Sequence, residues 1–322
     1  MADGLAVTKA DGDNIKRAEL AARELKNAIH FNPSELEELN VSYTKLLASI
    51  ISEFISKHQL TEIDAVCSHG HTILHQPQNG FTLQIGNLPI IRDLVNQTIV
   101  CDFRVQDVQL GGQGAPLVPI GDELLFSEYD YCLNLGGFSN VSFNENGNRI
   151  AFDISPVNVV LNYFAEKLGK NYDENGDFAK NGAINFKILE QLNALTFYQK
   201  SAPKSLGVEF VNSVVFPLLK DETPENIIAT FTEHIAEQIA KVFNDNQLKT
   251  VLVTGGGTFN TYLLEKIREK SQTELIVPDE NIINFKEALI FAFMGVLRVR
   301  NEVNVLCSAT GSSENHCSGI LV

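Results

Sequence analysis

Two glycine-rich turns are the features of this sequence that point most directly to chemistry. The apolar run Cys132–Leu135 leads into Gly136-Gly137, and the apolar run Val251–Thr254 leads into Gly255–Gly257. Glycine after a strand lets the backbone turn sharply and bring its N–H groups close to an anion, and a following helix N-terminus adds favourable potential. Neither turn fits the P-loop or the dinucleotide fingerprint. Either turn alone could be only structural, but the pair favours a phosphate or nucleotide site.

Asp153 is the third feature, at the end of the β-rich run Ile150–Ile154 and just before Ser155 and Pro156. Open α/β sheets place their chemistry at the carboxyl ends of strands, and a carboxylate there can act as a general base. The alternative is that Asp153 or Ser155 caps the helix opened by Pro156. The sequence leaves both interpretations open.

The elements that must position these residues alternate between strand and helix. In the first half we expect helices at 15–30 and 33–58, the second with Asn32 at its N-cap. Short strands follow at 65–68, 81–85, 98–103, 131–135, 140–144 and 150–154. In the second half we expect helices at 157–168, 184–195, 224–244, 258–270 and 285–300, and strands at 250–254 and 274–278. Such alternation indicates βαβ units, and the predicted class is α/β with a parallel or mixed sheet. The helix Phe285–Arg300 is apolar nearly all round and is expected to be buried, either across the domain junction or at a subunit interface.

Length and charge limit the classes of function. A chain of 322 residues favours two domains, and we expect an N-terminal domain at 1–144 and a C-terminal domain at 145–322. The net charge of −15 argues against nucleic acid and against an anionic membrane surface as partners.

Cysteine usage and hydropathy indicate a soluble, cytoplasmic protein. The five cysteines are widely spread and form no C-x-x-C pair, which is typical of reduced thiols. No run approaches the roughly 18 apolar residues that a membrane helix needs. The residues up to Arg17 carry charges throughout and are not expected to form a signal peptide.

The histidines His69, His71 and His75 raise a separate hypothesis. On a strand, the His-x-His spacing would place His69 and His71 on one face, and Asp102 nearby would make a metal-dependent hydrolase conceivable. The remaining histidines are scattered and supply no second ligand set. We therefore predict no metal-ligand site, and a core or hydrogen-bonding role at least for His75.

Taken in order, a set of segments resembles the anhydro-N-acetylmuramic acid kinases, from about Leu25 to the C-terminus. The matching segments are 68–72 with 75–77, 84–87, 102–104, 111–119, 134–137, 152–153 with Pro156 and Asn158, 203–205 with Gly207, 254–257, 287–288 and 310–311. The longest of them is Gly111–Pro119.

The resemblance implies a two-domain, actin-like ATPase (ribonuclease H-like) fold with Mg-ATP and an amino sugar in an interdomain cleft. It implies ATP-dependent phosphorylation of the sugar at O6 while a water opens the anhydro bridge, giving N-acetylmuramic acid 6-phosphate and ADP in peptidoglycan recycling. It also implies a homodimer. Asp153 matches the family's general base. The matching nucleotide-binding residues are Gly136, Gly137, Gly255, Gly256 and Gly257, and the residues assigned to the sugar are His71, Gln84, Asp102, Arg104 and Asn134.

The sequence departs from the family at its start. The family opens with a Gly-Thr-Ser-x-Asp-Gly phosphate loop, whereas this chain offers only Asp3-Gly4 as a counterpart. We therefore expect a truncated first domain and impaired catalysis, which leaves a sugar- or nucleotide-binding relative as an alternative to the kinase. The residues up to Arg17 could equally be an unrelated leader. Val208 also stands where many relatives carry Arg.

Overall fold

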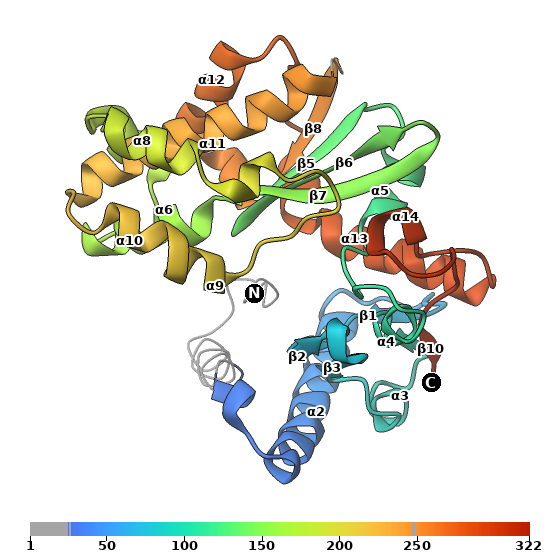
Figure 1. Ribbon diagram of the computed structural model, residues 1–322. Helices are drawn as coiled ribbons and strands as arrows, with labels where there is room; N and C mark the ends of the chain where they lie inside the picture. The colour runs from blue at the N-terminus through green and yellow to red at the C-terminus, as the bar shows by residue number, and fades with distance from the viewer. Residues whose placement is uncertain (1–24, 26, 247–248) are drawn as a thin grey trace. The chain divides into compact units, whose positions relative to one another are not determined.

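The structure, a computed structural model, describes residues 25, 27–246 and 249–322 (Figure 1). Asp3 and Gly4 lie outside these residues. The described chain forms two compact units. Unit 1 comprises the residues up to Ile120 together with Ala288–Val322, and unit 2 is Gly121–Glu287. This division differs from the boundary expected at 144/145, because strands from both sides of that position pair in one sheet.

Unit 2 is built on a five-stranded mixed sheet in the order β7-β6-β5-β8-β9. The strands are β5 (Tyr131–Leu135), β6 (Phe138–Glu145), β7 (Asn148–Pro156), β8 (Thr250–Thr254) and β9 (Glu274–Ile276). β5, β6 and β7 form an antiparallel meander, whereas β8 runs parallel to β5 and to β9. The predicted α/β class with a mixed sheet is confirmed.

One face of this sheet carries the core of unit 2. Successive strand residues point to opposite faces, so Leu133, Val141, Ile154 and Val253 share the apolar face and are buried. Figure 1 shows α6 (Asn158–Lys167) and α11 (Pro224–Asn246) on the same side of the sheet. α12 (Thr261–Lys270) contributes to the same core.

The opposite face carries a buried network of charges. Ser142 Oγ donates to Asp122 Oδ2 at 2.5 Å, and Arg149 Nη2 donates to Ser142 Oγ at 2.9 Å. Lys286 Nζ lies 2.6 Å from Asp122 Oδ1. This network ties β6 and β7 to α5 (Pro119–Leu125) and to the start of α13 (Glu280–Val299).

Unit 1 contains two small sheets and a long helix. β1 (Val66–Ser68) pairs in parallel with β4 (Ile99–Cys101), and β10 (Ile320–Leu321) is antiparallel to β4. β2 (His71–Gln76) and β3 (Phe81–Ile85) form the second sheet. The expected N-cap of α2 (Pro33–Lys57) is confirmed, since the Asn32 side chain accepts hydrogen bonds from the first turn in a capping box.

The remaining helical elements are short. They are η1 (Ala28–His30), η2 (Pro77–Asn79), α3 (Ile90–Val95), α4 (Val105–Gln109), η3 (Glu174–Gly176), α7 (Asp177–Asn181), α8 (Phe186–Asn193), η4 (Thr196–Gln199), α9 (Val208–Phe210), the π-helix η5 (Val211–Val215), α10 (Phe216–Leu219), η6 (Gly256–Phe259) and α14 (Cys307–Thr310). No helix in the described ranges is both long and apolar enough to cross a bilayer.

One expectation about local structure is wrong. His69 and His71 do not share a strand, because the chain turns between β1 and β2 at Gly70, whose φ is +67°. Within the single chain, α13 is covered on one side: Phe291 and Met294 are buried, but Val296 and Val299 are 52% and 55% exposed. Only one side of this helix packs against its own unit, where the Phe291 and His69 rings are 4.6 Å apart.

The buried ion pair yields a stability prediction. Replacing Lys286 with Ala strands the Asp122 carboxylate in a buried site, which should lower the free energy of unfolding by about 3–5 kcal/mol. Replacing Arg300 with Ala removes an ion pair whose two side chains are 66% and 44% exposed, and should cost about 0–1 kcal/mol. Urea unfolding monitored by circular dichroism measures both changes. Equal effects of the two substitutions would contradict the assigned role of the network.

Candidate functional site

A row of polar side chains crosses the sheet of unit 2 on the face opposite the core. The strand register places Asp153 on β7 opposite Asn140 on β6, Asn140 opposite Asn134 on β5, and Asn134 opposite Thr254 on β8. Asp153, Asn140 and Asn134 are each half-buried. The predicted carboxylate and the predicted turns therefore lie at the same end of one sheet, near the carboxyl ends of β5, β7 and β8.

Asp153 is held by the backbone and does not cap a helix. Its Oδ2 accepts a hydrogen bond from the Leu206 N–H at 2.7 Å. α6 has Val157 at its N-cap with no side-chain cap, and Ser155 bonds across the sheet to Ser139 instead. The capping interpretation is wrong because β7 continues through Pro156, so the chain at Asp153 is still extended.

Burial raises the pKa of the Asp153 carboxyl and so makes the carboxylate a stronger base. Desolvation raises its pKa to about 6, against the opposing effect of the Leu206 N–H bond, which stabilises the charged form. A carboxylate with a pKa near 6 is ionised at neutral pH and is more basic than an exposed aspartate. This is the kind of pKa that suits a general base near neutrality.

The two glycine turns meet around Asn134. A Cβ on Gly255 would overlap Asn134 Oδ1, and a Cβ on Gly136 would lie 3.2 Å from Asn134 Nδ2. Gly255 also has a φ of +84°, which side-chain-bearing residues rarely adopt. Asn134 therefore lies between the turns, so the structure groups it with the residues expected at the nucleotide.

The glycines of the turns differ in what surrounds them. A Cβ on Gly257 would stand 2.8 Å from Leu135 Cβ, so packing alone requires glycine there. Gly137 and Gly256 have nothing within 4 Å of a Cβ position and no positive φ. The packing of the fold therefore does not itself require glycine at these two positions.

Asn158 is a supporting residue that the sequence analysis did not assign to the site. Its Nδ2 donates to Leu135 O at 3.1 Å and to Gly136 O at 2.8 Å, which braces the first turn from α6. The Val157 N–H also donates to Gly137 O at 2.8 Å. The signal was its place in the matching run that begins at Phe152, but a role as a brace requires the tertiary structure.

In unit 1, the structure gathers several of the residues assigned to the sugar. Gln84 Nε2 donates to Thr82 Oγ1 at 2.7 Å, and the same hydroxyl lies 3.0 Å from His75 Nδ1. The hydrogen-bonding role expected for His75 is thus observed. Arg104 Nη1 donates to Gly114 O at 2.6 Å, and the Arg104 charge helps to lower the pKa of His75 after desolvation, the larger cause.

The other residues assigned to the sugar have separate environments. His71 pairs with Ile85 across the β2–β3 hairpin, and burial lowers its pKa. Asp102 follows β4 with a φ of +56°, and burial raises its pKa. His69 is half-buried beside Phe291, and its pKa falls to about 4, first through desolvation and then through the Arg104 charge.

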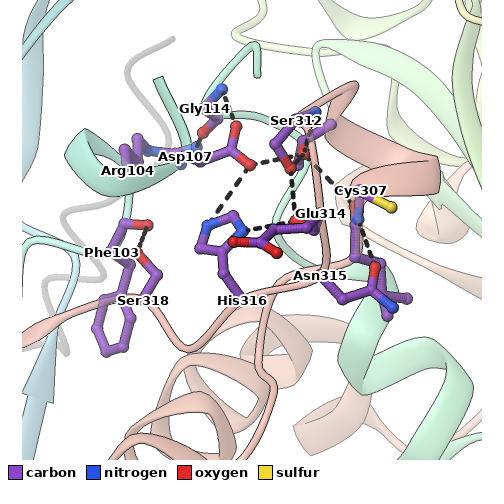
Figure 2. Close-up of polar contacts among 12 residues, drawn as sticks. Phe103, Arg104, Asp107, Gly114, Cys307, Ser312, Glu314, Asn315, His316 and Ser318 are labelled. Carbon is purple, nitrogen blue, oxygen red and sulfur yellow. Dashed lines mark hydrogen bonds and ion pairs between the residues drawn. The ribbon is translucent and has the colours of Figure 1, made fainter. Parts of the chain in front are cut away.

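Asp107 holds the long glycine-rich segment Gly111–Pro119 in place, as Figure 2 shows. Its carboxylate is fully buried and accepts hydrogen bonds from the Gly114 N–H and from Thr310 Oγ1, each at 2.6 Å. His316 Nε2 lies 3.7 Å from Asp107 Oδ1. The sequence analysis missed Asp107, whose partner Thr310 lies some two hundred residues away along the chain.

The described residues contain no group of three or more His, Cys, Asp or Glu side chains that could hold a metal ion. The turn at Gly70 also separates His69 from His71. The metal-dependent hydrolase therefore has no support in this part of the chain.

An α/β sheet whose glycine turns stand beside a carboxylate of raised pKa fits an enzyme that acts on a phosphate-bearing ligand. The chain belongs to the anhydro-N-acetylmuramic acid kinase family, whose family model matches residues 18–322. That membership places it among the sugar kinases of the actin/hexokinase-like superfamily.

Individual relatives agree with this assignment. The anhydro-N-acetylmuramic acid kinase of Acinetobacter baylyi is 34% identical over 304 residues, covering 85% of this chain and 81% of the relative. The enzyme of the same name from Pseudomonas fluorescens is 36% identical over 277 residues, covering 79% and 74%. A solved activator of 2-hydroxyisocaproyl-CoA dehydratase from Clostridium difficile shares 17% identity at a TM-score of 0.35, over 57% of this chain and 66% of that one, a similarity too low to support a conclusion.

The glycine environments yield a prediction that separates ligand binding from packing. Gly256→Ala should leave the free energy of unfolding unchanged within about 0.5 kcal/mol and weaken ATP binding at least about tenfold, because a methyl group would occupy the space open to a ligand. Gly257→Ala should destabilise the fold by about 1–3 kcal/mol through its clash with Leu135. Thermal unfolding and calorimetric titration with ATP analogues measure the two effects. Normal ATP affinity in Gly256→Ala would show that the nucleotide does not contact this turn closely.

Proposed function

We propose that this chain phosphorylates anhydro-N-acetylmuramic acid with ATP and opens its anhydro bridge with water. The observation that carries the proposal is Asp153, a half-buried carboxylate with a pKa of about 6 at the position of the family's general base. In the proposed reaction, Asp153 takes a proton from water, the water oxygen bonds to the anomeric carbon, and the bond from that carbon to O6 breaks. O6 receives the γ-phosphoryl group, so the products are N-acetylmuramic acid 6-phosphate and ADP.

The geometry of Asp153 supports this role. Leu206 N–H occupies Oδ2, which leaves Oδ1 as the oxygen that can accept a proton from a bound water. Since only one of its oxygens is engaged, the carboxylate is both oriented and available. Orientation of this kind contributes to rate because the reacting groups meet in a single geometry.

The nucleotide would lie against the two turns. The open spaces at Gly137 and Gly256 fit the close approach of phosphate groups, and the Asn134 amide between the turns can meet polar atoms of the ligand. Bound Mg²⁺ would neutralise charge on the phosphates during transfer. The protein's part is to hold those phosphates with backbone donors.

For the sugar, the proposal retains His71, Gln84, Arg104 and Asp102. Gln84 is supported by a specific observation: its Oε1 is buried without a hydrogen-bond partner among the described residues, while its Nε2 is engaged. A buried acceptor without a donor is costly, and a sugar hydroxyl or a water would relieve that cost.

Asp153 predicts the pH dependence of the reaction. Asp153→Asn should lower kcat about 10²–10⁴-fold, the usual contribution of a general base. In the wild type, kcat/KM should fall tenfold per pH unit below a midpoint near 6. Mass spectrometry of the product, heavier than the sugar by one phosphoryl group and one water, measures turnover.

Stability provides the control for that substitution. The folded pKa of Asp153 is raised from 3.8 to about 6, so its contribution is fully present below pH 3.8 and is lost as the pH rises through 6. At neutral pH, the free energy of unfolding of Asp153→Asn should therefore be at least as high as that of the wild type. Full activity in a folded Asp153→Asn variant would overturn the assignment of the base.

We also propose that the protein works in the cytoplasm as a homodimer. All five cysteines are free thiols, which fits a reducing compartment. In unit 1, Leu289, Val296 and Val299 are 43–55% exposed and follow one another at seven and three residues. This heptad-like spacing makes an apolar stripe along one side of α13, of the kind that pairs with a second helix.

The stripe predicts the site of dimerisation. Val296→Glu would introduce a charge into the paired surface and should weaken the dimer at least about tenfold. Val41→Glu is the control, since Val41 is also exposed but lies on α2. Sedimentation equilibrium at micromolar protein distinguishes the two variants. A wild-type monomer, or an unaffected Val296→Glu dimer, would refute this interface.

A further inference from the structure

The segment Pro203–Leu206 is the support on which Asp153 depends. The Asp153 N–H donates to Lys204 O at 3.0 Å, and the Leu206 N–H donates to Asp153 Oδ2 at 2.7 Å. β7 is the edge strand of its sheet, so this segment lies along an edge that no other strand covers. The backbone N–H of Asp153 and its carboxylate are thus both bonded to the same short segment.

This segment has little of its own to hold it in place. It belongs to no helix or strand, and Ala202, Pro203 and Ser205 are exposed. Irregular, exposed backbone with few buried contacts opens readily unless a side chain anchors it. Its half-buried side chains, Lys204 and Leu206, are therefore the candidates for an anchor.

Lys204 makes the specific contacts. Its Nζ lies 4.9 Å from the centroid of the Phe197 ring and 5.5 Å from that of the Phe152 ring. Phe152 directly precedes Asp153 and packs against the core on the opposite face of the sheet. The ammonium group is thus held on the core side of β7, while the Lys204 carbonyl bonds to Asp153.

The electrostatic surroundings show that aromatic rings, not a carboxylate, hold this cation. Among the described residues, no carboxylate oxygen lies within 4 Å of Lys204 Nζ. The charged group that acts on it is Lys241, and burial followed by that like charge lowers the Lys204 pKa. A cation placed over two rings is stabilised by their negative faces.

We propose that Lys204 is a positioning residue for Asp153: its ammonium group, seated on Phe152 and Phe197, fixes the segment whose Leu206 N–H orients the carboxylate. The inference rests on the proposed function, in which Asp153 is the base. Lys204 itself touches no reacting atom in this scheme.

The consequence for Asp153 has a definite sign. The Leu206 N–H stabilises the ionised carboxylate and opposes the effect of burial. Releasing the segment weakens that bond while Asp153 stays on its strand, so the pKa of Asp153 rises above about 6. The loss of orientation lowers the rate further.

The test compares Lys204→Met with Lys204→Arg in the full chain. Carbon-13 NMR of labelled aspartate carboxyls, with the Asp153 signal assigned by its absence in Asp153→Asn, measures the carboxyl pKa directly. Lys204→Met should raise it by about one unit and lower kcat about tenfold at neutral pH, with the KM for the sugar changed less than about threefold. Lys204→Arg keeps a cation over the rings and should restore both values.

Lys167→Met is the matched control, because Lys167 Nζ also lies over an aromatic ring, at 4.7 Å from the Tyr163 centroid, and makes no contact with Asp153. It should change neither value. Phe197→Leu, which removes one of the two rings, is the second variant and should shift the pKa in the same direction by less. An unchanged Asp153 pKa in folded Lys204→Met, or an equal change in Lys167→Met, would overturn the proposal.

The NMR measurement also separates this inference from the proposed function. If Asp153→Asn keeps full activity, the assignment of the base fails, whereas the pKa shift in Lys204→Met still reports whether Lys204 supports the carboxylate. If Asp153→Asn is inactive and Lys204→Met shifts nothing, the base stands and the positioning role of Lys204 fails.

Discussion

The pairing register of β5, β6 and β7 is the constraint on which the rest of this structure depends. It sets Asp153, Asn140 and Asn134 in one row on one face of the sheet. Because side chains alternate along a strand, a shift of one residue would send Asp153 into the apolar core and Phe152 onto the polar face. Burial of Leu133, Val141 and Ile154 against α6 and α11 makes such a shift costly. The core thus specifies the site on the other side of the same sheet.

The polar face is stabilised by means suited to polar groups. The network of Asp122, Ser142, Arg149 and Lys286 satisfies charges that burial would otherwise penalise, and it joins two strands to two helices. At the row itself the side chains are only half-buried, and Asp153 relies on backbone N–H and C=O groups from Pro203–Leu206. The buried network therefore supports the sheet, while the row of Asp153, Asn140 and Asn134 stays partly exposed, as a binding site requires.

In unit 1, a buried carboxylate again supports residues that were expected to contact the ligand. Asp107, fully buried, bonds to Gly114 and Thr310 and so joins the glycine-rich segment Gly111–Pro119 to the C-terminal part of the chain. Arg104 bonds to Gly114 from the other side. Arg104, which the sequence analysis assigned to the sugar, thus also stabilises the conformation of this loop.

The sequence by itself determined the α/β class, the glycine turns, the family and the place of Asp153 near the end of a strand. These features are local: an apolar run followed by glycine predicts a strand and a turn wherever it stands, and ordered motifs can be read without coordinates. It also specified the Asn32 cap, because the N-cap and its partners lie within three residues of one another. Its division of the chain near residue 144 followed the change from a strand-rich half to a helix-rich half.

Only the tertiary structure decided which residues act together. It joined residues up to Ile120 with Ala288–Val322, separated His69 from His71 at Gly70, and showed that Asp153 accepts a bond from Leu206 and caps no helix. It also showed which side of α13 stays exposed within the single chain, namely the side of Val296 and Val299. These outcomes depend on contacts between residues far apart in the chain. The free energy of such contacts comes from packing and from hydrogen-bond partners that no local pattern of residue types encodes.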